Sequence, residues 1–234
     1  MPRTEIFLDK YRELESLIRS QNNLKETESI LNFIKNSPKV RFWKEQMEYC
    51  AEVRNLLFHR PRLSESYAVV PSEEMIITLE TLVKDLQNRK RCRDIAILKS
   101  GVYSQGLEDL VKPAISTMRS KKFTHIPILE AGKVVGVFSE NSLFNYVADQ
   151  EFCLISEEMK FTELENYLSL QGRDVETFTF FPFDNYVSDL SIEFEENFNR
   201  GKRLGMVFLT TNGKPKESLL GILTPWDILA RENR

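Results

Sequence analysis

Cysteine and histidine are scarce in this sequence. Its 234 residues include three cysteines and two histidines, and Cys50, Cys92 and Cys153 lie far apart with no Cys-x-x-Cys pair. Neither a disulfide framework nor a zinc site is therefore expected, because both need cysteines or histidines at characteristic spacings. We expect reduced, mostly buried thiols and no bound metal.

Long apolar segments are also missing. A membrane-spanning helix needs about 20 apolar residues, and no run in this sequence approaches that length. The first residues, MPRTEIFLDKYRELES, alternate charged and apolar side chains where a signal peptide would have an apolar block. With 41% hydrophobic and 29% charged residues, the composition matches an ordinary globular protein. We therefore expect a cytoplasmic protein without membrane contact.

The charge distribution has one local exception. The net charge of -3 argues against general coating of nucleic acid, so no DNA binding is expected. Between residues 35 and 62, however, seven basic side chains stand against three acidic ones, and the basic ones are Lys35, Lys39, Arg41, Lys44, Arg54, Arg60 and Arg62. Such a run is most often a solvated helix face. The alternative is an electrostatic track for RNA.

Four amphipathic patterns predict helices in the N-terminal part, over residues 4–20, 24–36, about 38–59 and 72–88. Ser72 is a good N-cap for the last of them, with Glu73 and Glu74 in its first turn. Short connections between the helices indicate an antiparallel bundle over residues 1–88. The basic string RKRCRD, residues 89–94, marks the expected end of this domain.

The remainder of the chain contains an internal repeat. Residues 124–147 and 204–230 both follow the pattern strand, turn, strand, helix, and VVGVFS aligns with LLGILT at an offset of 85 positions. The alignment pairs Gly136 with Gly221, Ser139 with Thr224 and Ser142 with Asp227. The predicted fold class is therefore α+β, with a helical bundle followed by two strand-helix repeats.

This doubled pattern resembles the paired CBS motifs of a Bateman module. The resemblance covers residues 94–234, with a first motif at 94–150 and a second at 173–234. It implies a regulatory adenine nucleotide (AMP, ATP or cyclic di-AMP), with Thr224 at the phosphate and Asp227 at the ribose. A hydroxyl beside helix N-terminal amides suits a phosphate, and a carboxylate can accept both hydroxyls of a ribose.

The first motif departs from this pattern, because Ser142 stands where the ribose-binding acid belongs. Ser139 keeps the hydroxyl on the phosphate side, so it is a nucleotide-binding candidate at a site expected to be weaker or empty. An alternative for the second motif is that Thr224 and Asp227 only cap the last helix, since Thr-Pro-Trp-Asp also fits an N-cap followed by proline. His125, on a predicted strand, is expected at a strand surface or pocket wall.

The segment RNLLFH, residues 54–59, resembles the motif of the HEPN superfamily. The resemblance covers about residues 1–88 and implies a homodimeric, metal-independent endoribonuclease that requires no cofactor for catalysis. It assigns the scissile phosphate to Arg54, orientation to Asn55 and proton transfer to His59, for which these side chains are chemically suited. Residues implied to bind RNA are Lys44, Arg60 and Arg62.

Several functions remain open. The leading hypothesis is a dimer in which a nucleotide bound to the CBS pair controls RNA cleavage by the HEPN-like domain. The alternative is a non-catalytic nucleotide sensor whose helical domain serves dimerisation or partner binding. In that case Arg54 makes an ion pair with Glu45 or Glu52, and His59 is favoured by the helix dipole. A third possibility, an antitoxin-like subunit that pairs with a nucleotidyltransferase, rests on family analogy.

Overall fold

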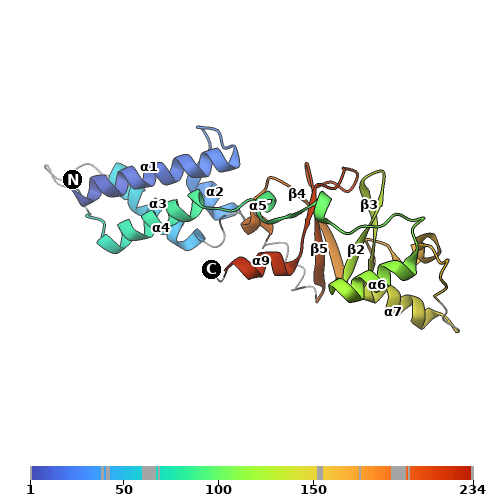
Figure 1. Ribbon diagram of the computed structural model, residues 1–234. Helices are drawn as coiled ribbons and strands as arrows, with labels where there is room; N and C mark the ends of the chain where they lie inside the picture. Colours follow the sequence, from blue (N-terminus) through green and yellow to red (C-terminus); the bar gives the residue numbers. More distant parts are fainter. Residues whose placement is uncertain are drawn as a thin grey trace. The chain divides into compact units, whose positions relative to one another are not determined.

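The chain folds into two compact units, Met1–Arg89 and Lys90–Arg234. The structure is a computed structural model that describes residues 2–37, 40, 43–59, 67, 69–151, 155–173, 175–190, 199 and 201–232. The first unit is helical, whereas the second combines helices with strands (Figure 1). Among the residues described, no helix is both long enough and apolar enough to cross a membrane.

The N-terminal unit is built from α1 (Arg3–Asn22), α2 (Ile30–Asn36), α3 (Lys44–His59) and α4 (Glu73–Gln87). Helix α1 packs against α4, and α3 contacts the other three helices. Their apolar faces share one core, which includes Phe7, Tyr11, Leu14, Ile18, Ile34, Met47, Cys50, Leu79 and Leu86. The Ser72 hydroxyl accepts the Met75 N–H at 3.2 Å, so the predicted N-cap of α4 is confirmed.

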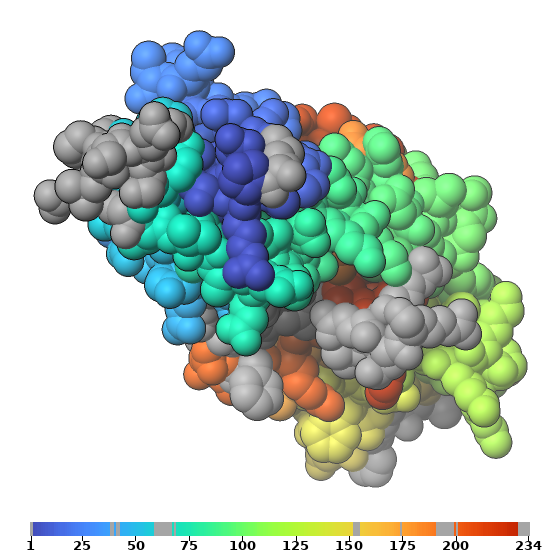
Figure 2. All heavy atoms as spheres, turned by 90° about the vertical axis from the view of Figure 1, so that its left-hand side faces the viewer, coloured from blue at the N-terminus to red at the C-terminus, as the bar shows by residue number. Residues whose placement is uncertain are grey.

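Helix α2 is shorter than the sequence pattern predicts. The expected start near residue 24 is wrong, because Asn23 ends α1 in the left-handed conformation, with φ of 54°. Ser29 then caps α2 by accepting the Asn32 N–H at 3.2 Å. The connecting loop, in medium blue, projects from the helical unit (Figure 2). Helix α3 begins at Lys44, and its expected start at Pro38 lies outside the described residues.

The described residues of the C-terminal unit form two sheets. The larger has the strand order β1-β6-β5-β4 and the smaller is the hairpin β2-β3. The bounds are β1 (Ile97–Leu98), β2 (His125–Glu130), β3 (Lys133–Ser139), β4 (Glu176–Pro182), β5 (Arg203–Thr210) and β6 (Gly221–Leu223). Strands β4 and β5 are parallel, while β6 is antiparallel to both β1 and β5.

Short helices surround these sheets: α5 (Cys92–Ile95), α6 (Val111–Lys121), α7 (Glu140–Asp149) and α9 (Pro225–Glu232), with the 3₁₀ helices η2 (Lys99–Gly101) and η3 (Phe161–Tyr167). The linking helix predicted within residues 152–172 is the 3₁₀ helix η3, and residues 152–154 lie outside the described part. The helix predicted near residues 187–202 is helical at 187–190, and residues 191–198 are likewise not described.

The sequence repeat corresponds to two structural halves. In the first half β3 leads into α7, and in the second half β6 leads into α9. The two glycines occupy matching positions, with Gly136 opposite Ile128 and Gly221 opposite Leu209. Apolar side chains from both halves meet in one layer, made of Val134, Val137, Met206, Phe208, Leu219 and Ile222. The two sheets lie side by side in Figure 1. This layer holds the ends of β3 and β6 in fixed positions.

Both glycines are required by a close backbone approach. A Cβ atom at Gly136 would lie 2.9 Å from the Leu168 carbonyl oxygen, and one at Gly221 would lie 2.8 Å from the Ile97 carbonyl oxygen. Real Cβ atoms essentially never come so close to another atom. Each half therefore needs glycine where a neighbouring segment crosses its strand.

We predict that Gly221→Ala destabilises the C-terminal unit by about 1–3 kcal/mol, because the added methyl group pushes β1 away from β6. Gly106→Ala is the matched control, since its Cβ would meet its nearest neighbour at 3.5 Å, an ordinary contact. The control should change the free energy of unfolding by less than about 1 kcal/mol. Urea denaturation measures both effects, and equal losses in the two variants would contradict the close approach at Gly221.

Candidate functional site

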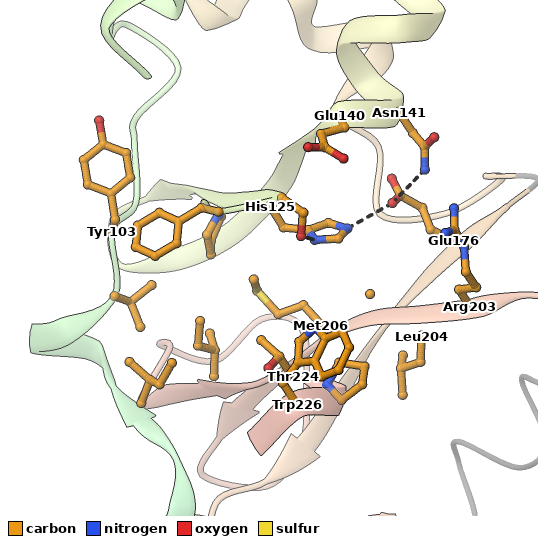
Figure 3. A pocket seen from close by; sticks show the side chains of 18 of the residues that line it. Tyr103, His125, Glu140, Asn141, Glu176, Arg203, Leu204, Met206, Thr224 and Trp226 are labelled. Atoms are coloured by element: carbon orange, nitrogen blue, oxygen red, sulfur yellow. Dashed lines mark hydrogen bonds and ion pairs between the residues drawn. The ribbon is translucent and has the colours of Figure 1, made fainter. Parts of the chain in front are cut away.

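A cavity of about 720 Å³ lies between the two halves of the C-terminal unit. In Figure 3, His125, Glu140 and Asn141 form one wall, and Thr224 and Trp226 form the opposite wall. The first three side chains come from β2 and the start of α7, and the last two flank the start of α9. The volume is suited to a small organic ligand, because such sites commonly enclose several hundred Å³.

The second half presents Thr224 to this cavity. Strand β6 ends at Leu223, and Pro225 opens α9, so Thr224 occupies the turn between them. The Thr224 N–H and hydroxyl donate to Asp227 Oδ2 at 2.8 and 2.7 Å. Oδ1 of the same carboxylate makes no hydrogen bond with any residue that the structure describes. One half of the capping arrangement is therefore present: the Asp227 side chain accepts the Thr224 N–H, whereas the Thr224 hydroxyl donates to Asp227 and accepts no N–H from a described residue. Thr224 lines the cavity, and Asp227 is not among the described residues that line it.

The first half uses its matching residues differently. Ser139 caps α7 by accepting the Ser142 N–H at 3.2 Å, and the Ser142 hydroxyl accepts the Ser139 N–H at 3.1 Å. Both serines are 1% exposed. The Ser139 hydroxyl, expected on the phosphate side, instead donates to Glu176 Oε1 at 2.7 Å. This hydroxyl belongs to a buried network.

Arg173 and Glu176 form the centre of that network. The Arg173 guanidinium makes an ion pair with Glu176, and its Nη1 lies 3.1 Å from both serine hydroxyl oxygens. Its Nη2 donates to the Val137 and Tyr167 carbonyl oxygens at 2.6 and 3.2 Å. The side chains of Arg173 and Glu176 are only 12% and 5% exposed. The pair is therefore shielded from water and anchored to the backbone of β3.

The Glu176 carboxylate also contacts two residues of the cavity wall. Its Oε2 lies 3.0 Å from His125 Nε2 and accepts a hydrogen bond from Asn141 Nδ2 at 3.1 Å (Figure 3). Burial raises the pKa of Glu176, but the hydrogen bonds from His125, Ser139 and Asn141 outweigh it and bring the pKa to about 2. The carboxylate is therefore ionised at neutral pH. The predicted wall position of His125 is confirmed.

The remaining wall is basic and aromatic. Lys122, Lys202 and Arg203 line the cavity, and so does the Glu140 carboxylate. Arg173 makes its ion pair with the other carboxylate on the wall, that of Glu176. Aromatic residues on the wall are Tyr103, Phe123 and Trp226, and the Trp226 side chain is 79% exposed. An excess of cations with flat apolar surfaces favours a ligand that combines an anionic group with a planar ring.

The residues predicted for RNA cleavage lie on or near α3 of the other unit. Arg54 Nη1 donates to Asn55 Oδ1 at 3.2 Å, and the guanidinium lies 4.6 Å from the centre of the Phe58 ring. Arg54 also lies 3.9 Å from Glu15 and 5.9 Å from the centre of the Tyr11 ring. The ion-pair partners expected from the sequence, Glu45 and Glu52, were therefore wrong, because α1 brings Glu15 to this position.

The other predicted residues of this unit are placed only in part. His59 ends α3, and its side chain lies outside the described residues, as do Arg60 and Arg62. Lys44 Nζ donates to the Lys35 carbonyl oxygen at 2.8 Å and lies 3.9 Å from Glu48. The Lys44 ammonium thus has partners within the helical unit.

Metal ligands do not gather in the part of the chain that is described: no group of three or more His, Cys, Asp or Glu side chains there could hold a metal ion. Cys50 and Cys92 are buried free thiols, as expected, and burial raises their pKa values to about 11 and 12. Cys153 lies outside the described residues.

Sequence reasoning missed Arg173 and Glu176. The i, i+3 spacing of opposite charges was visible just before the strand TFTFF, but such pairs are common at protein surfaces. Nothing in the local sequence indicates that the Arg173 side chain reaches Ser139 and Val137 of the first half. Trp226 was also missed as a wall residue, because an exposed tryptophan beside a proline carries no distinctive pattern.

Comparison with known proteins identifies one part of this unit. Residues 107–149, which include β2, β3 and α7, match the CBS domain family. The chain therefore contains a CBS domain. No curated protein matches the sequence.

Several solved structures are similar to this chain at low identity. An acetoin utilization protein (AcuB) from Vibrio cholerae is 14% identical over 62% of this chain and 91% of its own, with a TM-score of 0.45. The CBS domain pair of protein MJ0100, in complex with 5-methylthioadenosine and S-adenosyl-L-methionine, is 17% identical over 62% and 97%, with a TM-score of 0.43. CBSX2 in complex with AMP is 13% identical over 61% and 96%, with a TM-score of 0.42.

We predict that Glu176→Gln destabilises the C-terminal unit by about 3 kcal/mol, because it leaves the Arg173 charge buried without its counterion. Glu140→Gln is the matched control, since Glu140 also lines the cavity but is exposed. It should change the free energy of unfolding by less than about 1 kcal/mol.

Glu176→Gln should also change how the stability of the protein depends on pH. The folded-state pKa of Glu176 is depressed to about 2, so its contribution to stability is present above the ordinary carboxyl pKa of 4.5 and is lost as the pH falls toward 2. Urea denaturation between pH 7 and pH 2.5 should show a smaller loss of stability in Glu176→Gln than in wild type. Parallel curves for the two proteins would contradict the assignment.

Proposed function

We propose that the C-terminal unit is a paired CBS module that binds an adenine nucleotide and thereby regulates the N-terminal unit. The observation that carries the proposal is the cavity between the two halves, with the Thr224 hydroxyl on its wall at the start of α9. The CBS match at residues 107–149 and the structural repeat support a second motif in the other half. The ligand class follows from the resemblance to CBS pairs.

The chemistry of the wall suits each part of such a ligand. The Trp226 N–H in the first turn of α9 is a donor for a phosphate, and the Thr224 hydroxyl becomes a second donor when it turns from Asp227 to the ligand. Lys122 and Arg203 supply positive charge. Asp227 caps Thr224 through Oδ2 alone, which leaves Oδ1 for a ribose hydroxyl. Tyr103 and Trp226 offer flat surfaces to a base. The candidates are AMP, ATP and cyclic di-AMP.

We predict that Thr224→Val weakens AMP binding by roughly 10- to 100-fold, because a hydrogen bond to a charged group contributes about 1.5–3 kcal/mol. Thr224→Ser keeps the hydroxyl and should stay within about threefold of wild type, since each factor of ten corresponds to 1.4 kcal/mol. Isothermal titration calorimetry measures the affinities, and ATP and cyclic di-AMP are titrated in parallel. Equal affinities for the valine and serine variants would remove Thr224 from the phosphate site.

The regulated activity belongs to the helical unit, and it takes one of two forms. In the first, a homodimer cleaves RNA with Arg54, Asn55 and His59, and Lys44, Arg60 and Arg62 contact the RNA. In the second, the helical unit serves dimerisation or partner binding without chemistry. The contacts of Arg54 with Glu15 and Phe58 favour the second form, because a guanidinium held by its own unit is less available for a phosphate.

We therefore expect no RNA cleavage that depends on His59. A pool of single-stranded RNA is incubated in EDTA with wild type, His59→Ala and Arg54→Ala, with and without AMP or ATP. Any residual cleavage should be equal in wild type and His59→Ala. Cleavage that both variants abolish, while circular dichroism shows them folded, would contradict this expectation and establish the ribonuclease.

A further inference from the structure

The two halves of the C-terminal unit have matching backbones, but the polar side chains at their strand-to-helix turns make different contacts. In the second half, Thr224 lines the cavity, and one oxygen of Asp227 is uncommitted among the described residues. In the first half, the matching hydroxyls of Ser139 and Ser142 both contact Arg173 Nη1 at 3.1 Å. The guanidinium of the chain itself thus occupies the polar groups that a ligand would use there.

The difference arises in the segments that cross the strands. Before the first half, Ile97 pairs with β6, and the chain then forms η2, whose Gly101 lines the cavity without a side chain. Before the second half, the Leu168 carbonyl oxygen accepts the Val137 N–H of β3 at 2.9 Å, and the chain then reaches Arg173. After crossing its strand, the segment before the first half leaves space at Gly101, whereas the segment before the second half inserts the Arg173 side chain.

The inserted cation is held by many contacts. Arg173 donates to the Val137 and Tyr167 carbonyl oxygens as well as to Glu176. Glu176 in turn contacts His125, Ser139 and Asn141. A ligand that entered this end would have to separate two buried opposite charges, which is strongly unfavourable.

We infer that the Arg173–Glu176 ion pair closes the first-half end of the cavity, so that each chain binds one nucleotide, with its phosphate at Thr224. The inference rests on the proposed function, because it concerns the same cavity and ligand class. It assigns Arg173 and Glu176 as residues that determine stoichiometry and contact no ligand phosphate.

The test is the number of AMP molecules bound per chain, measured by isothermal titration calorimetry on the full-length protein, with ATP titrated in parallel. Wild type should bind one. Thr224→Val should lose at least tenfold in affinity, whereas Ser142→Ala should stay within about twofold. In Arg173→Ala/Glu176→Ala, which leaves the net charge unchanged, a second and weaker binding event should appear beside an unchanged first one.

The possible results separate the inference from the proposed function. Two molecules bound per wild-type chain, or binding that Ser142→Ala weakens and Thr224→Val does not, would overturn the inference and leave nucleotide sensing intact. One molecule bound by a folded Arg173→Ala/Glu176→Ala variant would show that the pair is not what closes this end. No binding of AMP or ATP to wild type would overturn both. If the double variant does not fold, the wild-type stoichiometry and the affinities of Thr224→Val and Ser142→Ala still test whether each chain binds one nucleotide at Thr224.

Discussion

The buried ion pair between Arg173 and Glu176 fixes the arrangement of the C-terminal unit. A carboxylate and a guanidinium can remain charged out of water only when every polar atom around them is positioned to compensate. Here the compensation comes from separate parts of the chain, since Val137 lies on β3, His125 on β2 and Asn141 on α7. The need to keep two charges satisfied therefore sets the positions of three elements and of the segment that links the halves.

The same constraint explains why a repeated sequence does not give two equivalent sites. Both halves end a strand with a hydroxyl residue that is hydrogen-bonded to the residue three positions later, in the first turn of the next helix. In the second half this later residue is an acid that has an oxygen to spare. In the first half the corresponding residue is Ser142, and its hydroxyl is already committed to Ser139 and to Arg173. A repeat supplies the backbone for two sites, whereas the side chains around each turn decide whether a ligand can enter.

Features that depend on local chemistry could be predicted from the sequence. The Ser72 cap and the strand-helix unit of each repeat are determined by residues near one another in the chain. The start of α2 was missed because Ser29 and Asn23 set its limits against the apolar pattern. The partners of Arg54 and Arg173 were missed for another reason. Glu15 reaches Arg54 from a different helix, and Val137 meets Arg173 only after the halves have packed, so neither contact has a signal in local sequence.

The position of Thr224 determines where a bound ligand would act. A ligand shifts a conformational equilibrium only through contacts that differ between the two states. The groups around Arg173 are tightly bonded to one another and offer little that could change. Thr224, by contrast, immediately precedes α9 and Asp227 lies in its first turn, and their mutual hydrogen bonds compete for the atoms that a phosphate and a ribose require. Ligand binding in the cavity would therefore first change the conformation at the beginning of α9, while the first half keeps its arrangement.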